Sequence, residues 1–187
     1  MRFTLHYDGP LPSRGSSAVK GSIREALEPQ LRELWTLPPL GAMAEEYLAK
    51  KTGPEEWTAL IERHGHVFAA VVPEGFGIVA ELDVLMLRAG PPGEIVKTHG
   101  DIDNRLKTLF DALSAPAQAN QVPQDMRPTS TADPMFVLLG DDSLISRVNV
   151  EAERLLAPST PDSTIVTVRV TTRIVQPMLG NMPLGSA

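Results

Sequence analysis

Several runs of β-branched and aliphatic residues constrain the fold of this chain more than any other feature. Residues 67–72 and 76–88 read VFAAVV and FGIVAELDVLMLR around a Pro-Glu-Gly turn, and residues 164–175 read TIVTVRVTTRIV. Such composition is typical of β-strands, and alternation of apolar with polar residues indicates a strand with one buried face. The chain is therefore expected to contain a sheet with long strands.

We predict that two hairpins supply most of this sheet. The first spans residues 67–88 and turns at the Pro-Glu-Gly sequence, and the second spans residues 146–175. Further short strands are expected at residues 2–7 and 136–139. These strands would pair mostly with their neighbours in sequence, in an antiparallel arrangement.

The first half of the chain also carries helical signals. Ser22 and Glu25 have the spacing of a capping box, which predicts a helix start, and Pro29 predicts a kink or two short helices there. Residues 45–51 resemble one helical piece, and a second is expected to begin near Pro54. The apolar side of that second piece would comprise Trp57, Leu60 and Ile61.

The most regular helical pattern lies at residues 102–113. Its apolar residues form one stripe: Ile102, Leu106, Leu109, Phe110 and Leu113. Residues 114–135 have no periodicity and predict a long mobile loop, and residues 176–187 predict a flexible tail. The predicted fold is α+β, a mostly antiparallel (mixed) sheet with helices packed on it, in one domain over residues 1–175.

The composition excludes several classes of protein. With 42% hydrophobic residues among 187, a single domain can bury an ordinary core, and the absence of cysteine excludes disulfides and thiol chemistry. A net charge of −6 argues against a broad basic face that coats DNA. We see no signal-peptide pattern and no apolar run long enough to cross a membrane, and we expect a soluble, cytoplasmic protein.

Four aspartates carry the candidate chemistry. Asp101 and Asp103 stand two residues apart where a loop becomes the helix, so in extended geometry both carboxylates point to one side. Asp141 and Asp142 follow the short buried strand. Oxygen ligands of this kind suit Mg²⁺ or Mn²⁺, which can activate water and polarise a phosphoryl oxygen. The spacing therefore suggests a divalent-metal site.

The helix itself adds a cation to this picture. Asp103, Lys107 and Asp111 recur every four residues, on the side opposite the apolar stripe. Lys107 could then stabilise negative charge on a phosphate. However, Asp103 also fits a helix cap, and an Asp-Asp pair also fits a turn, so spacing alone leaves the structural and the metal-binding interpretations open.

The same residues resemble the RusA family of Holliday junction resolvases. The shared pattern is D-x-D-N-x-x-K at Asp101–Lys107, a D-A-L at Asp111–Leu113, and Asp141-Asp142 before Leu144-Ile145. The resemblance covers roughly residues 101–145. In this chain Ser114 to Gly140 separate the helix from the Asp-Asp pair, where the family has a short turn.

The resemblance implies a homodimeric, magnesium-dependent endonuclease that cuts branched DNA in recombination and repair. It assigns the metal ligands to Asp101, Asp103 and Asp142, and a catalytic role to Lys107. Supporting roles fall to three further residues: Asp141, Asn104 and Asp111. Alternatives are a non-catalytic prophage or mobile-element module that keeps the fold, and a metal-dependent phosphoesterase acting on small nucleotides.

Other candidate residues are weaker. Arg14, Lys20 and Arg24 form the one basic cluster near a Gly/Ser loop and are possible DNA-phosphate contacts. We interpret the histidines as structural or loop residues: His64, His66 and His99. Trp35 and Trp57 are expected in the core rather than on a base-stacking platform.

Overall fold

The computed structural model describes residues 1–50, 57–89, 102–158, 160 and 163–185. These residues form the following elements: β1 (Arg2–Pro10), α1 (Ser17–Leu34), α2 (Leu40–Tyr47), β2 (Leu60–Arg63), β3 (His66–Val72), β4 (Ile78–Arg88), α3 (Ile102–Leu113), η2 (Ala119–Gln121), β5 (Met135–Leu139), η3 (Asp142–Leu144), β6 (Ile145–Arg154), β7 (Ser163–Ile174) and η4 (Met182–Leu184).

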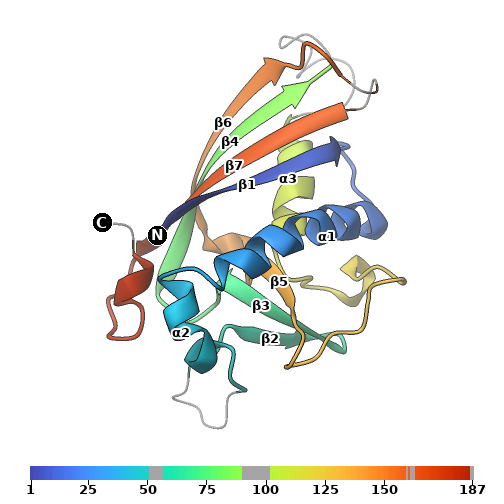
Figure 1. The fold of residues 1–187 in the computed structure, drawn as a ribbon. Coiled ribbons are helices and arrows are strands. Elements are labelled where there is room, and N and C mark those ends of the chain that lie inside the picture. The colour runs from blue at the N-terminus through green and yellow to red at the C-terminus, as the bar shows by residue number, and fades with distance from the viewer. Residues whose placement is uncertain (51–56, 90–101, 159, 161–162, 186–187) are drawn as a thin grey trace.

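The strands form two separate mixed sheets (Figure 1). The larger has the order β1-β7-β4-β6, with β7 antiparallel to both β1 and β4, and β6 parallel to β4. The smaller has the order β2-β3-β5, antiparallel between β2 and β3 and parallel between β3 and β5. The predicted α+β class with helices packed on a mixed sheet is confirmed.

The predicted hairpin of residues 67–88 is wrong, because β3 and β4 lie in different sheets. The link between them contains Gly75 and Gly77, both with positive φ (82° and 61°). A Cβ on Gly77 would lie 2.7 Å from the carbonyl oxygen of Gln176, so the chain passes close to the C-terminal segment here. Glycine adopts positive φ without steric cost, and this link carries the chain out of one sheet and into the other instead of folding it back.

The second predicted hairpin is also wrong in its pairing, although both strands exist. β4 lies between β6 and β7, and it pairs with β7 from Ile78 to Arg88. Every second residue of β4 is buried. With eleven residues, β4 is longer than the strands of the smaller sheet, which could not pair with its full length. Because β4 lies between two long strands, the N–H and C=O groups on both of its edges are hydrogen-bonded. A local hairpin of β6 with β7 would leave the groups on one edge of β4 without partners.

Helix α1 begins earlier than the sequence suggested. Ser16, not Ser22, caps it by accepting a hydrogen bond from the backbone N–H of Val19 at 3.3 Å. The helix runs through Pro29 as one element, so the predicted division into two short helices is wrong. Pro29 and the residue four positions earlier, Glu25, are both exposed, and water can therefore solvate the carbonyl that proline leaves unbonded.

The helices expected between residues 45 and 61 are largely misplaced. α2 spans Leu40–Tyr47, and Leu60 and Ile61 belong to β2 rather than to a helix. The start predicted near Pro54 lies outside the described residues. Trp57 packs against Phe76 with ring centroids 5.3 Å apart, so it joins the core as expected but from an irregular segment.

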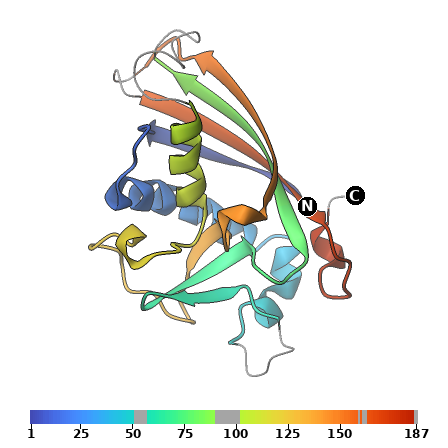
Figure 2. The same cartoon turned by 180° about the vertical axis from the view of Figure 1, so that it is seen from behind.

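The main core lies between the larger sheet, α1, α3 and one face of the smaller sheet. A second, small core covers the other face of β3 and β5, where Phe68 and Val137 meet Ala115 and Met126. The segment after α3 therefore packs over the smaller sheet (Figure 2). Whether residues 114–135 move in solution stays a prediction.

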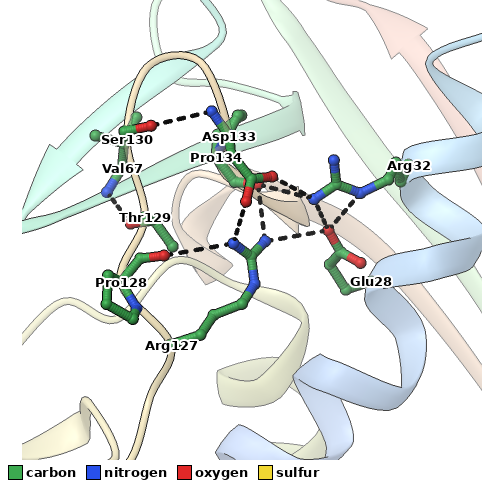
Figure 3. A network of polar contacts seen from close by, with 9 residues as sticks. All are labelled: Glu28, Arg32, Val67, Arg127, Pro128, Thr129, Ser130, Asp133 and Pro134. Carbon is green, nitrogen blue, oxygen red and sulfur yellow. Dashed lines mark hydrogen bonds and ion pairs between the residues drawn. The ribbon is translucent and has the colours of Figure 1, made fainter.

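A polar network fastens this segment to α1 (Figure 3). Asp133 accepts hydrogen bonds from Arg32 at 2.9 Å and from Arg127 at 2.8 Å, one on each carboxylate oxygen. Glu28 accepts from Nε of Arg32 at 2.9 Å and lies 3.5 Å from Arg127. The Arg32 guanidinium also lies 4.8 Å from the ring centre of Phe136. Two arginines and two carboxylates thus join residues far apart in sequence.

None of the helices in the described ranges is both long and apolar enough to cross a bilayer.

Candidate functional site

Helix α3 carries the residues of the candidate site. The contacts of its buried face hold the helix in place. Leu109 and Leu113 are buried in the main core. Thr108 accepts a hydrogen bond from the backbone N–H of Gly15 at 3.1 Å, and the buried Arg105 donates to the carbonyl of Leu11. These contacts fix α3 against the segment between β1 and α1, which leaves the opposite side of the helix free.

That free side carries the residues that the sequence singled out. Asp103, Asn104 and Lys107 are exposed, and Asp103 accepts a hydrogen bond from the backbone N–H of Asn104 at 2.7 Å. Neither Asp103 nor Lys107 forms an ion pair with any residue that the structure describes. The partial positive charge of the helix N-terminus favours a carboxylate there. Asp101 and His99 lie outside the described residues.

Asp111, predicted to support the site, is occupied elsewhere. Its carboxylate lies 2.6 Å from Nζ of Lys20, and both side chains are mostly buried, with 16% and 17% exposed. Lys20 is therefore an internal partner of α3. The pair links α1 to α3, so neither residue is held free for a ligand.

Arg24 is also structural, and its assignment as a possible DNA contact is wrong. It is 2% exposed and donates to the backbone carbonyls of Asp111 (2.8 Å) and Ser114 (3.1 and 3.2 Å). Burial lowers the pKa of Arg24 to about 10, with Asp111 opposing that shift, and the guanidinium stays charged at neutral pH. Of the predicted basic cluster, only Arg14 is exposed.

The Asp141–Asp142 pair follows β5, all of whose residues are buried. Asp141 caps η3 by accepting a hydrogen bond from the backbone N–H of Ser143 at 3.0 Å. The hydrogen bonds from Ser143 hold the pKa of Asp141 below its ordinary value, with a smaller contribution from Arg63. The Asp142 carboxylate is exposed and unpaired within the described part of the chain.

Asp103 lies in the first turn of α3, and the Asp-Asp pair begins elsewhere along the helix. Nη1 of Arg63 donates to the carbonyls of Ala115 (3.3 Å) and Gly140 (3.1 Å), so the Asp-Asp pair starts beside the C-terminal end of α3. Figure 2 shows η3, in orange, next to the end from which the chain leaves the helix. At about 1.5 Å per residue, Asp103 lies about 16 Å along the helix axis from Ser114, the residue that follows α3.

Asp142 is two residues beyond Gly140, a reach of at most about 7 Å. Within the described ranges no three acidic or histidine side chains are grouped so as to hold a metal ion. Asp101, one of the three ligands that the RusA resemblance implies, lies outside these ranges, so the three-aspartate magnesium site stays a prediction.

The Asp141–Asp142 pair starts beside the C-terminal end of α3 because of the long segment that follows the helix. A short turn would send β5 back along the helix, and five residues at ~3.3 Å each would return the pair close to the helix start. Instead, β5 pairs in parallel with β3, and Leu139 forms a parallel bridge with Ser114. The strand thus ends at the C-terminal end of α3.

His64 and Trp35 follow the structural interpretation, whereas His99 lies outside the described residues. His64 (φ 53°) and Gly65 (φ 78°) form the tight turn between β2 and β3. Trp35 is 4% exposed and packs against Phe136 with ring centroids 6.2 Å apart.

Sequence reasoning missed a charged group on the open face of the larger sheet. Glu81 accepts a hydrogen bond from Arg173 at 2.7 Å and lies 3.2 Å from Arg147, which also lies 3.5 Å from Asp83. The hydrogen bond from Arg173 is the main cause that holds the pKa of Glu81 below its ordinary value. A shallow hollow of about 350 Å³ lies beside this group, and Arg169 and Glu151 are among its lining residues. The alternation of charged and apolar residues in β4 was the available signal.

Comparison with known proteins does not extend this picture. No protein-family model matches the chain, and no curated protein matches it. The RusA resemblance therefore rests on the motif residues alone, and the function has to be inferred from the chain's own side chains.

Proposed function

We propose that this chain is a magnesium- or manganese-dependent endonuclease that cuts branched or structured DNA. The observation that carries the proposal is the free side of α3, where Asp103, Asn104 and Lys107 of the D-x-D-N-x-x-K motif are exposed together. A homodimer, a cytoplasmic location and a role in DNA recombination or repair belong to the same proposal.

The distribution of partners among the aspartates supports this choice. Asp111 is paired with Lys20, and Asp141 caps η3, so both have structural roles. Asp103 and Asp142 are exposed and lack a cationic partner in the described part of the chain. Carboxylates left without a partner cation are the ones that can take a metal ion.

The proposal is centred on the N-terminal end of α3. Asp101 and Asp103 are the ligands proposed there, and Lys107 is one helical turn further along. When bound, the ion would supply charge neutralisation for a phosphodiester and an activated water. Asp142 is the third ligand that the resemblance assigns, and its place at the same ion belongs to the proposal.

A second candidate function has a specific observation in its favour. Two of the predicted supporting residues, Asp111 and Asp141, are engaged in contacts within the fold, which a non-catalytic module would tolerate because it needs no metal site. It predicts no specific binding of Mn²⁺ at millimolar concentration and no cleavage of any DNA.

Cleavage of a branched DNA substrate in Mg²⁺ tests the proposal. Asp103→Asn should abolish cleavage and leave the melting temperature unchanged, because the side chain is exposed. Asp125→Asn is the matched control, since Asp125 is an exposed aspartate on a different segment. Undiminished cleavage by the Asp103→Asn variant would refute the proposal.

Calorimetric titration with Mn²⁺ separates the two candidates and the two ends of α3. Loss of binding heat in Asp103→Asn but not in Asp142→Asn would locate the ion at the helix start. Loss in both variants would indicate that Asp142 is a ligand of the same ion. Absence of any binding heat in the unmodified chain would favour the non-catalytic module.

A further inference from the structure

The two edges of the larger sheet are protected very differently. The edge strand β1 is covered at its centre, because the Gln30 side chain accepts from the backbone N–H of His6 (2.9 Å) and donates to its carbonyl (2.7 Å). Helix α1, which carries Gln30, also packs along β1. This edge has no room for another strand at His6.

The opposite edge strand, β6, has no comparable cover. It is ten residues long, and β4 is the one strand that pairs with it among the described residues. Edge strands are usually blocked by proline, lysine or a bulge. β6 has neither proline nor lysine, and its irregularity is confined to its first residues, opposite Ala80 and Glu81.

The register shows which backbone groups of β6 are free. The N–H of Leu155 donates to the carbonyl of Arg88, and the pairing is regular from Arg147 to Arg154. In a parallel pair the N–H and C=O of one residue point to the same side, and successive residues alternate. The odd-numbered residues therefore bond β4, whereas Val148, Val150 and Ala152 direct their N–H and C=O groups outward.

We propose that β6 pairs with β6 of a second copy of this chain, antiparallel and about a twofold axis at Val150. The two four-stranded sheets then become one continuous sheet of eight strands. In this register Val150 faces its own copy, and Val148 faces the partner's Ala152. Such an arrangement is isologous and closed, so it ends at the dimer.

The side chains of β6 are self-complementary in this register. Arg147 faces the partner's Glu153, and the twofold axis repeats the pair, so two opposite-charge pairs form across the interface. Both residues lie on the open face of the sheet, where Arg147 is beside Glu81 of β4 and Glu153 is beside Leu87. On the other face, Val148 is 40% exposed, and Val150 packs at the border of the main core. A second strand would cover both valines.

Charge reversal tests the pairing. We expect the chain to have twice the 20.2 kDa mass of one copy by light scattering at micromolar concentration. Arg147→Glu and Glu153→Arg should each raise the dimer dissociation constant about tenfold, since two pairs turn repulsive. The double variant should restore it. Arg2→Glu, the same charge change on the opposite edge strand, should have no effect.

A second variant keeps the test independent of charge. Val150→Pro removes an N–H that points outward, so the bonds from β6 to β4 are retained and the monomer should fold while dimerisation is lost. A monomeric unmodified chain, or a dimer unaffected by both Glu153→Arg and Val150→Pro, would overturn the inference. The readout is mass, so failure here is distinct from failure of the proposed nuclease activity.

Discussion

Removal of the Arg24 side chain should destabilise the protein strongly, because Arg24 serves as a buried cap for α3. Its guanidinium donates to the carbonyls of Asp111 and Ser114, which belong to the last turn of that helix and the residue after it. The last four carbonyls of a helix have no partner within the helix. A cation placed there also interacts favourably with the helix dipole.

The magnitude follows from these contacts. Two carbonyls lose a charged donor at a position that is 2% exposed, and each such hydrogen bond contributes about 1.5–3 kcal/mol. Arg24→Ala should therefore lower the free energy of unfolding by about 3–5 kcal/mol, a large share of the roughly 5–15 kcal/mol typical of a domain. Arg24→Lys should recover part of this, because it keeps the charge but not the two-pronged geometry.

Urea unfolding followed by circular dichroism measures this loss. Arg14→Ala is the matched control, because Arg14 belongs to the same predicted basic cluster but is exposed, and its removal should change stability by less than about 0.5 kcal/mol. A loss below about 1 kcal/mol for Arg24→Ala would refute the capping argument. Weakened DNA binding by a fully stable Arg24→Ala protein would reinstate Arg24 as a phosphate contact.

Three further predictions concern stability. Gly77→Ala should cost about 1–3 kcal/mol in urea unfolding, since a Cβ would lie 2.7 Å from a backbone oxygen at a residue with φ of 61°; the same change at Gly65, where a Cβ meets no atom within 4 Å, should cost less. Leu109→Ala should cost about 2–5 kcal/mol, because Leu109 is fully buried, and an unchanged melting temperature would contradict the core assignment. The pKa of Asp133 is lowered, first by the hydrogen bond from Arg32, so its stabilising effect is complete above its unfolded pKa of 3.8 and disappears as the pH falls through the lower folded value. Melting temperatures of the unmodified chain and Asp133→Asn should therefore converge on acidification, and a constant difference down to about pH 2 would contradict this.

Local sequence signals located most of the elements. The β-rich runs predicted β3, β4 and β7, and the apolar stripe of residues 102–113 predicted α3 within its observed bounds. Both signals depend on residues close together in the chain, namely side-chain alternation in a strand and a repeat of 3.6 residues in a helix. Trp35 was likewise placed correctly in the core, because a large apolar side chain is seldom left in water.

The same local signals misled where two structures share one pattern. Leu60 and Ile61 fit a helical face after Pro54, yet they lie in β2, whose pairing with β3 through the His64-Gly65 turn decides their conformation. Ser22 and Glu25 fit a capping box, yet Ser16 caps α1. Contacts made elsewhere in the fold selected between alternatives that the sequence left nearly equal in free energy.

By itself, the sequence determined the carboxylates and lysine of the candidate site and the exposed side of α3 that carries Asp103 and Lys107. Only the tertiary structure decided which strands pair, that Arg24 is a buried cap, and that the Asp141–Asp142 pair starts beside the C-terminal end of α3. The reason is that strand pairing depends on which long edges are left open after the chain has closed on itself. The parallel pairing of β5 with β3 fixes the direction of β5, and that direction alone determines to which end of the helix the Asp141–Asp142 pair is delivered.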